Sequence, residues 1–573
     1  MSADDKDAKG FRYRGLEFHS SRMWQWAQVS QALSFMQKFE LNMLIFHQND
    51  IVDDLVFPRA FFPEDLMWKR WPVRLHSIHQ NRHYINKVAR ETKARGIAFF
   101  LEIKEIWFVD QLLEQVPSLR NTDGSMCASN PFWWEFLEIK MRELIEAVPD
   151  LAGVIVSPGT RESKVSISTN TCACPRCAAT NPTEWYASLL GAMHRLLAEH
   201  GRTFSVRDFS YSADQQSRML DAARRCSDNI VISLKNTPHD YYPTFPDNPR
   251  IGNTGGLRQR IEFDTWGQFF GMGFFPVSVV EDMQQRMRHA KACGAEGIAL
   301  RTDWEVITDS GAFNSPNILN AIAGAMLARD VDADLDLVYA AWSRHGLYSP
   351  LQAASAMQPL HIPTHPQSSA MLKVFMQASW AVMEKSAYVR GHLFHEDDQY
   401  PDTVAKAFDM LVHIHGRDDW EPGASRLLAP TEGNLAVIFA EKAQAGAEVK
   451  RLPGVLQVRA LGLPATVAQE LETMLELYVL WVEGYELCAR AVFLVRTAQL
   501  SSSGDHIDAA RRTAAPLREF SRRVQARLRR TSYPHYVYWL LDTTRSDALA
   551  DDVEAQLSHL GHQGESALEQ GAR

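Results

Sequence analysis

The sequence lacks the long apolar runs and the basic clusters that mark two large classes of protein. It contains no apolar run of about 18 residues or more, so no segment is typical of a membrane-spanning helix. Lysine and arginine (60 residues) are fewer than aspartate and glutamate (69 residues) and do not gather in runs. We therefore expect neither a nucleic acid nor a membrane surface as a partner.

The N-terminal segment MSADDKDAKG lacks the basic and apolar stretches of a secretory signal, from which we expect a cytoplasmic location. Cysteine is also sparse, with seven in 573 residues. In such a chain the cysteines predict reduced thiols or a metal site rather than a framework of disulfides.

Three cysteines lie close together in the segment CACPRC, as Cys172, Cys174 and Cys177. Thiolates at this spacing can bind Zn²⁺, which prefers four ligands. No fourth ligand is adjacent in the sequence, and Cys127, on the preceding long loop, is one candidate. A structural zinc site, reduced structural thiols and a catalytic thiol remain the three alternatives.

What the sequence does contain, between residues 11 and 330, is an alternation of short apolar runs and amphipathic helical segments. The runs predicted to be strands are 11–18, 42–47, 96–103, 152–157, 203–209, 229–235, 259–264 and 296–302. Eight strand–helix units predict a closed parallel (β/α)8 barrel, the TIM barrel. A doubly wound open sheet is the alternative, but the glycine-rich phosphate turn of its nucleotide-binding forms is absent.

Beyond residue 330 the strand pattern stops, and residues 463–495 give the clearest helix. We therefore expect an all-α C-terminal domain after the barrel, packed on it or on a subunit partner. The predicted divisions are a polar tail (1–10), a catalytic barrel (11–330), a helical domain (331–562) and a flexible tail (563–573).

Polar side chains gather where the predicted strands end, at the rim where barrel enzymes build their active sites. Burying several charges in one place is costly unless they serve a ligand. The candidates for substrate binding are His19, His47, Arg161, Arg207, Lys235, Asn236, Asp264, Trp266, Arg301 and Asp303. Glu102, Lys104, Glu105 and Glu305 lie at the same rim.

Carboxylates at this rim suit the hydrolysis of a glycosidic bond, which needs one protonated and one ionised carboxyl group. Glu162 is the candidate acid, because Ser157, Pro158 and Gly159 let the chain turn sharply out of the fourth strand. Asp240 and Glu262 are the candidate bases, on the facing side of the barrel.

Two stretches, SLKNTPHDYY and RQRIEFDTWGQFF, resemble the family 67 α-glucuronidases, and RGLEFHSSRMW with LNMLIFHQND resembles families 67 and 20. The resemblance covers about residues 11–330. It implies inversion, with Glu162 at the acid position and Asp240 and Glu262 at the base positions. The sequence departs from family 67 near Gln268, where a second acidic residue would fall. Helical extensions in that family form dimer contacts, which implies a homodimer.

The leading hypothesis is therefore an exo-acting glycosidase that removes a terminal sugar, for example a uronic acid, from short oligosaccharides, without a cofactor for catalysis. Arg161, Lys235 and Arg301 could bind the sugar carboxylate, and Trp107, Trp266 and Trp304 could stack on sugar rings. The alternatives are a divalent-metal-dependent isomerase or lyase and a carbohydrate-binding protein without catalysis.

Overall fold

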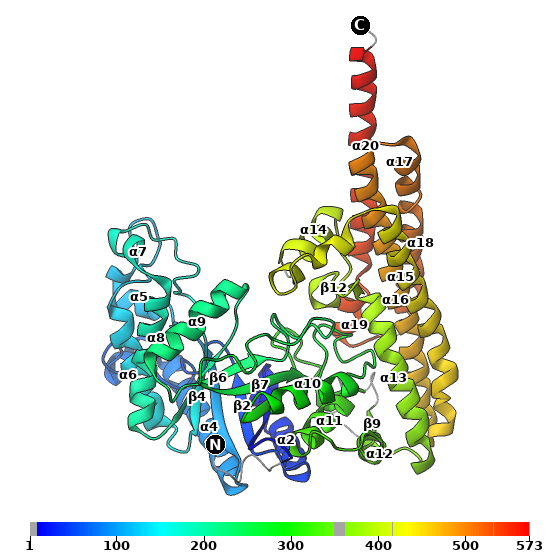
Figure 1. The fold of residues 1–573 in the computed structure, drawn as a ribbon. Coiled ribbons are helices and arrows are strands. Elements are labelled where there is room, and N and C mark those ends of the chain that lie inside the picture. The colour runs from blue at the N-terminus through cyan, green and yellow to red at the C-terminus, as the bar shows by residue number, and fades with distance from the viewer. Residues whose placement is uncertain (1–8, 349–360, 415, 531, 572–573) are drawn as a thin grey trace.

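The computed structural model describes residues 9–348, 361–414, 416–530 and 532–571 (Figure 1). Eight parallel strands form a closed barrel in chain order. They are β1 (Tyr13–Phe18), β2 (Met43–His47), β3 (Ala98–Lys104), β4 (Gly153–Ser157), β5 (Thr203–Arg207), β6 (Val231–Lys235), β7 (Arg258–Asp264) and β8 (Gly297–Arg301). β8 pairs in parallel with β1, with Gly15 opposite Ala299, so the sheet closes. The predicted barrel is confirmed, and the open sheet is not formed.

The strands read as nearly continuous apolar runs because both of their faces are buried. Alternate residues of β2 illustrate this: Met43 and Ile45 belong to the small core inside the barrel with Phe100 and Ile155. Leu44 and Phe46 belong instead to the larger core shared with the surrounding helices.

The helices that follow the strands lie around the barrel. The long ones are α2 (Trp26–Lys38), α4 (Pro72–Ala94), α6 (Phe132–Ala147), α8 (Pro182–Glu199), α9 (Ala213–Cys226), α10 (Val280–Ala292) and α11 (Ile318–Arg329), and the short ones are α3 (Glu64–Arg70), α5 (Gln111–Gln115) and α7 (Pro175–Ala179). The expectation of a helix after every strand is wrong at one place, because the fully described loop 236–257 contains none. Prolines at positions 238, 243, 246 and 249 explain this, since each removes a backbone donor and restricts the residue before it.

After α11 the chain is mainly helical, and its longest helices stand side by side next to the barrel (Figure 1). The helices are α12 (Leu335–His345), α13 (Ser369–Ser386), α14 (Val404–Asp409), α15 (Glu432–Leu456), α16 (Ala465–Ser501), α17 (Gly504–Arg511), α18 (Ala514–Leu528), α19 (His535–Leu540) and α20 (Thr543–Gly571). Two short antiparallel pairs interrupt them, β9 (Leu347–Tyr348) with β10 (His361–Ile362) and β11 (Tyr388–Val389) with β12 (His392–Leu393). No helix in the described residues is long and apolar enough to cross a bilayer.

The predicted tails at the two ends of the chain are described to different extents. Residues 1–8 and 572–573 lie outside the described residues. At the C-terminal end, α20 continues to Gly571. Residues 563–571, for which the sequence predicts a flexible tail, are therefore helical.

The barrel and the helical part share one continuous core. Phe275, in the loop after β7, stacks on Tyr478 of α16 with ring centroids 4.7 Å apart, and its ring lies 5.1 Å from that of Trp481. The Asp398 carboxylate accepts hydrogen bonds from the backbone N–H groups of Gly271 (2.6 Å) and Met272 (3.2 Å). The helical part therefore packs directly on a loop that leaves the C-terminal end of the barrel.

Candidate active site

A pocket of about 160 Å³ lies at the C-terminal ends of the barrel strands. Seven of the eight strands or the loops that follow them contribute to it, and the helical part adds one further residue, Asp397. The lining residues are His19, Lys104, Glu162, Arg207, Phe209, Tyr211, Asp240, Gln268, Arg301, Trp304, Glu305 and Asp397. This is the rim at which (β/α)8 enzymes carry out their chemistry.

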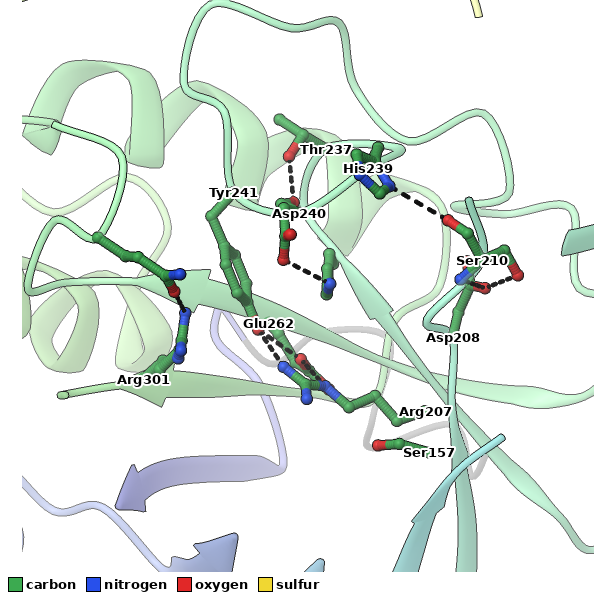
Figure 2. A network of polar contacts seen from close by, with 12 residues as sticks. Ser157, Arg207, Asp208, Ser210, Thr237, His239, Asp240, Tyr241, Glu262 and Arg301 are labelled. Carbon is green, nitrogen blue, oxygen red and sulfur yellow. Dashed lines mark hydrogen bonds and ion pairs between the residues drawn. The ribbon is translucent and has the colours of Figure 1, made fainter. Parts of the chain in front are cut away.

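Arg207, at the end of β5, forms the floor of this pocket and is only 2% exposed. Its guanidinium donates to Glu262 Oε2 through Nε (2.7 Å) and to the Tyr241 hydroxyl through Nη2 (2.6 Å) (Figure 2). It also donates to Glu102 Oε1 through Nη1 (3.0 Å). Such pairing offsets the cost of burying a charge. Arg207 therefore organises carboxylates from two other strands beneath the pocket.

Glu262, on β7, uses both carboxylate oxygens in this floor. Oε2 accepts from Tyr241 (2.7 Å) as well as from Arg207, and Oε1 accepts from Ser233 (2.6 Å). Burial alone would raise the pKa of Glu262, but Arg207 and these hydrogen bonds outweigh burial and lower it. Glu262 is thus ionised, but it is not among the residues that line the pocket.

Deeper in the barrel, His47 Nδ1 lies 2.9 Å from Glu17 Oε1, and both side chains are fully buried. Burial and the nearby Glu102 raise the pKa of Glu17 to about 8, while burial and the charge of His19 lower the pKa of His47. Ligand atoms of Glu17, His19 and His47 all lie within 4.8 Å of one another, an arrangement that could hold a cation.

Glu162 reaches the pocket from the loop after β4, and its side chain is 38% exposed. Its Oε2 forms an ion pair with Lys104 Nζ at 2.8 Å. The predicted sharp turn is present: Gly159 has a φ of +83°, and its N–H donates to the Glu105 carboxylate. Burial raises the pKa of Glu105 to about 7.

Asp240 reaches the pocket from the loop after β6, with Lys235 Nζ 2.6 Å from its Oδ1 (Figure 2). Burial alone would raise the pKa of Asp240, but Lys235 and His239 outweigh it and hold the pKa far below its usual range. The Asp240 backbone has a φ of +46°, a strained conformation for a non-glycine residue. Strain of this kind is concentrated at functional sites.

His19 and Glu305 line this pocket and also a second one of about 340 Å³ beside it, which includes Trp24, Gln48 and Trp107. His19 Nε2 lies 2.7 Å from Glu305 Oε2. Although burial opposes the effect, His19 and Arg301 lower the pKa of Glu305 to about 2. The contact between His19 and Glu305 thus stands between two neighbouring pockets at the barrel mouth.

No protein-family model matches the sequence, and no curated protein matches it significantly. Solved structures do match. A GH138 enzyme targeting pectin rhamnogalacturonan II superposes on 92% of this chain with a TM-score of 0.61 and 12% identity. The chain spans 63% of the length of that enzyme. The chain therefore shares the overall fold of that enzyme.

Weaker matches are other glycosidases. They include the GH20 exo-β-N-acetylglucosaminidase of Vibrio harveyi (TM-score 0.37, 14% identity, covering 56% of this chain and 55% of the other). The O-GlcNAc hydrolase of Thermobaculum terrenum, in a mutant form, has a TM-score of 0.40 at 12% identity and covers 97% of both chains.

Within this fold, eight of the residues named from the sequence as candidates or as members of the rim meet in the one pocket. They are His19, Lys104, Glu162, Arg207, Asp240, Arg301, Trp304 and Glu305. The other named residues lie behind or beside it. Lys235 supports Asp240 from behind, and His47 lines the second pocket.

Several of the residues assigned to substrate binding instead hold the loops in place. Trp266 is completely buried and donates from Nε1 to Ser310 (3.0 Å), so the expected stacking on a sugar is wrong. Asp264 accepts from the N–H of Gln268 (2.8 Å), and Asp303 accepts from the N–H of His19 (2.6 Å).

Two further corrections concern residues that do not line the pocket. Arg161 packs over the Tyr211 ring at 5.1 Å, outside the pocket itself. Asn236 is buried near the end of β6, and its backbone N–H donates to the Glu262 carbonyl (2.9 Å).

No sequence pattern predicts a functional role for Tyr211, Tyr241, Gln268 or Asp397. Tyr241 directly follows Asp240, so its place in the same loop was a usable signal. Gln268 donates to Asp397 Oδ1 (3.1 Å) and accepts from Arg301. Nothing in the sequence pattern around Asp397 links it to the barrel mouth.

Proposed function

We propose that the protein is a glycoside hydrolase whose reaction takes place in the pocket formed by Glu162, Asp240 and Arg301. The observation that carries the proposal is that Glu162 and Asp240, from the loops after β4 and β6, line the same pocket. Hydrolysis of a glycosidic bond uses two carboxyl groups on opposite sides of the bond. The fold shared with a GH138 enzyme supports the same conclusion.

Asp240 is the proposed base. Lys235 keeps its carboxylate ionised, which is the state required to activate water. Glu262 is also ionised, but both of its oxygens are occupied by Ser233, Arg207 and Tyr241. We assign Glu262 a positioning role, in which it fixes Arg207 and Tyr241 under the substrate.

Glu162 is the proposed general acid, and it must carry a proton when the leaving group departs. Without substrate it is paired with Lys104. We infer that the bound substrate separates this pair, so that Glu162 can protonate the glycosidic oxygen. The neighbouring ring of Phe209, 4.7 Å from Lys104 Nζ, offers the displaced ammonium a second contact.

Asp397 supplies a second carboxylate near the base. Family 67 has a second acidic residue near the position of Gln268, and here Gln268 donates to the Asp397 carboxylate. We propose that Asp240 and Asp397 together orient the attacking water, and that the anomeric configuration is inverted.

The proposed substrate is a terminal uronic acid on a short oligosaccharide in the cytoplasm. A pocket of about 160 Å³ is small, which favours one sugar unit and exo action. Arg301 can bind the sugar carboxylate, because its buried Nε has no hydrogen-bond partner within the described part of the chain. Trp304 and Tyr211 can contact the sugar ring. The similar GH138 enzyme targets a pectin, which supports a plant cell-wall glycan as the source.

The test compares Glu162→Gln and Asp240→Asn with Glu199→Gln, an exposed glutamate at the end of α8. Aryl uronides and neutral aryl hexosides of both anomers serve as substrates. We expect the two pocket variants to lose roughly 10²–10⁴-fold in kcat and the control to match the wild type. Proton NMR of the first product anomer tests inversion. Full activity of either pocket variant, or activity on neutral hexosides alone, would contradict the assignments.

A second candidate function is that of a divalent-metal isomerase or lyase, and the cluster of Glu17, His19 and His47 favours it. In that case a chelator would abolish turnover and Mn²⁺ or Mg²⁺ would restore it. A third, carbohydrate binding without catalysis, would give sugar affinity by calorimetry with no hydrolysis of any substrate in the panel.

A further inference from the structure

Four cysteine side chains converge away from the pocket, on the outer parts of two long loops. Cys127 belongs to the loop between β3 and α6, and Cys172, Cys174 and Cys177 belong to the segment between β4 and α8. Their sulfur atoms all lie within 4.8 Å of one another. Cys127 Sγ is 3.7 Å from Cys174 Sγ and 3.4 Å from Cys177 Sγ.

These distances suit a tetrahedral metal site. Four thiolates around Zn²⁺, each with a Zn–S bond of about 2.3 Å, lie about 3.8 Å from one another. The same distances are far too long for disulfides, whose sulfur atoms are about 2.05 Å apart. We propose that Cys127, Cys172, Cys174 and Cys177 bind one structural zinc ion.

The surroundings of the four sulfur atoms support this assignment. The Cys177 N–H donates to Cys174 Sγ (3.4 Å), and Asn121 Nδ2 donates to Cys172 Sγ (3.4 Å). Such outer hydrogen bonds orient thiolate ligands and offset their negative charge. A ligand set made only of sulfur selects zinc or iron over magnesium, calcium or manganese.

The segment that carries Cys127 is held by hydrogen bonds that do not involve the four sulfur atoms. Trp133 Nε1 donates to the Cys127 carbonyl (3.0 Å), and Trp185 Nε1 donates to the Ala128 carbonyl (2.8 Å). Ser129 and Thr180 join the same two loops through their hydroxyls, 2.7 Å apart. The fourth ligand is therefore held beside the other three by packing from α6 and α8, which favours a rigid, closed site.

The zinc ion would join the two segments that follow β3 and β4, close to Lys104 and Glu162. Lys104 is the last residue of β3, and the segment after it passes through Cys127, whereas the segment after β4 carries Glu162 and then the other three cysteines. A backbone bridge between Ile106 and Val165 already links the loops close to the pocket. If the proposed function holds, the zinc ion positions the Lys104–Glu162 pair by fixing the outer ends of both loops.

The first test is the metal content of the full-length protein, purified without chelator and measured by inductively coupled plasma mass spectrometry. We expect one zinc per chain in the wild type and in Cys226→Ser, whose cysteine lies outside the cluster. Cys127→Ser and Cys174→Ser should lose the zinc and unfold at lower temperature. Wild-type protein without zinc after growth in zinc-supplemented medium, or Cys127→Ser with full zinc content, would overturn the proposal.

A second measurement does not depend on variants that could fail to fold. Co²⁺ exchanged into the wild type should give the intense visible bands and the sulfur-to-metal charge transfer of a tetrahedral tetrathiolate site. Weak octahedral bands, or one bound iron in place of zinc, would overturn it. Glu162→Gln should keep its zinc whether or not it hydrolyses glycosides, so failure of the zinc site and failure of the proposed hydrolase are distinguished.

Discussion

Individual charged residues at the barrel mouth owe their protonation states to their neighbours. Asp240 is ionised because of Lys235, whereas Glu105 lies in a buried site where no cation outweighs desolvation. The pKa values of the two carboxyl groups are therefore shifted in opposite directions, although each group lies in a loop that follows a strand. A single substitution at either should therefore have a distinct dependence on pH.

Glu105→Gln should make the free energy of unfolding less dependent on pH. The pKa of Glu105 is about 7 in the folded protein against an ordinary value of 4.5, so folding takes up a proton between those values. Its contribution to stability is complete below the ordinary pKa and is lost as the pH rises through about 7. Because glutamine is neutral and can still accept from Gly159, the variant should match the wild type at pH 4.5 and exceed it by up to about 3 kcal/mol at pH 8.

Denaturant unfolding at both pH values tests this expectation, with the exposed Glu199→Gln as the control. Equal stability of the variant and the wild type at pH 8 would mean that Glu105 is ionised at little cost in the folded protein.

The sequence points to Glu162 and Asp240 because each lies in the loop that follows an apolar run, and the barrel geometry brings such loops together. It could not separate residues that touch the pocket from residues that support it. Asp264 and Asp303 follow strands in the same way, yet their carboxylates accept from backbone N–H groups. That difference depends on loop conformation, which is set by contacts between distant parts of the chain.

At the scale of elements, the eight strands could be predicted within about two residues, because a strand buried on both faces has a simple apolar pattern. The loops that follow them have no comparable pattern. The loop after β6 lacks a helix and is shaped by its prolines, while the turn after β4 depends on one glycine with positive φ.

Gly159→Ala tests whether the turn after β4 determines the position of Glu162. A β-carbon at Gly159 would lie 2.7 Å from Gln215 Nε2, on a backbone that already disfavours L-residues. Gly201 also has positive φ (+65°) but has open space around it, so Gly201→Ala imposes similar backbone strain without the contact. We expect both variants to lose about 1 kcal/mol of stability.

Only Gly159→Ala should also lose activity, by roughly tenfold or more in kcat, because small displacements of reacting groups are costly. Parallel measurements of kcat and of thermal unfolding separate the two effects. Equal activity of the two variants would show that the turn tolerates the β-carbon without moving Glu162.

On the scale of the whole molecule, the helical part contributes to the pocket at the barrel mouth. Its packing through Phe275, Tyr478 and Trp481 belongs to the same core as the barrel helices. Asp397 then projects into the pocket, and Trp539 of α19 holds its backbone through a hydrogen bond to the carbonyl (3.0 Å). The homodimer expected through the helical domain stays a prediction.

Asp397→Asn should therefore impair a reaction whose other groups all come from the barrel. We expect kcat to fall by roughly tenfold to a hundredfold, with little change in thermal stability, because asparagine keeps the size and one acceptor oxygen of the side chain. Asp409→Asn, at the exposed end of α14, is the matched control. An unchanged kcat would leave Asp240 as the sole base.

The position of Asp397 also constrains how such an enzyme can be altered. Its carboxylate is separated from the end of β8 by nearly a hundred residues of chain, and it reaches the pocket only if the helices are docked. A barrel excised at residue 330, or grafted onto a different partner domain, would lack the wall of the pocket that Asp397 provides. Substitutions in the helices that displace Asp397 are therefore expected to change which ligands the pocket accepts.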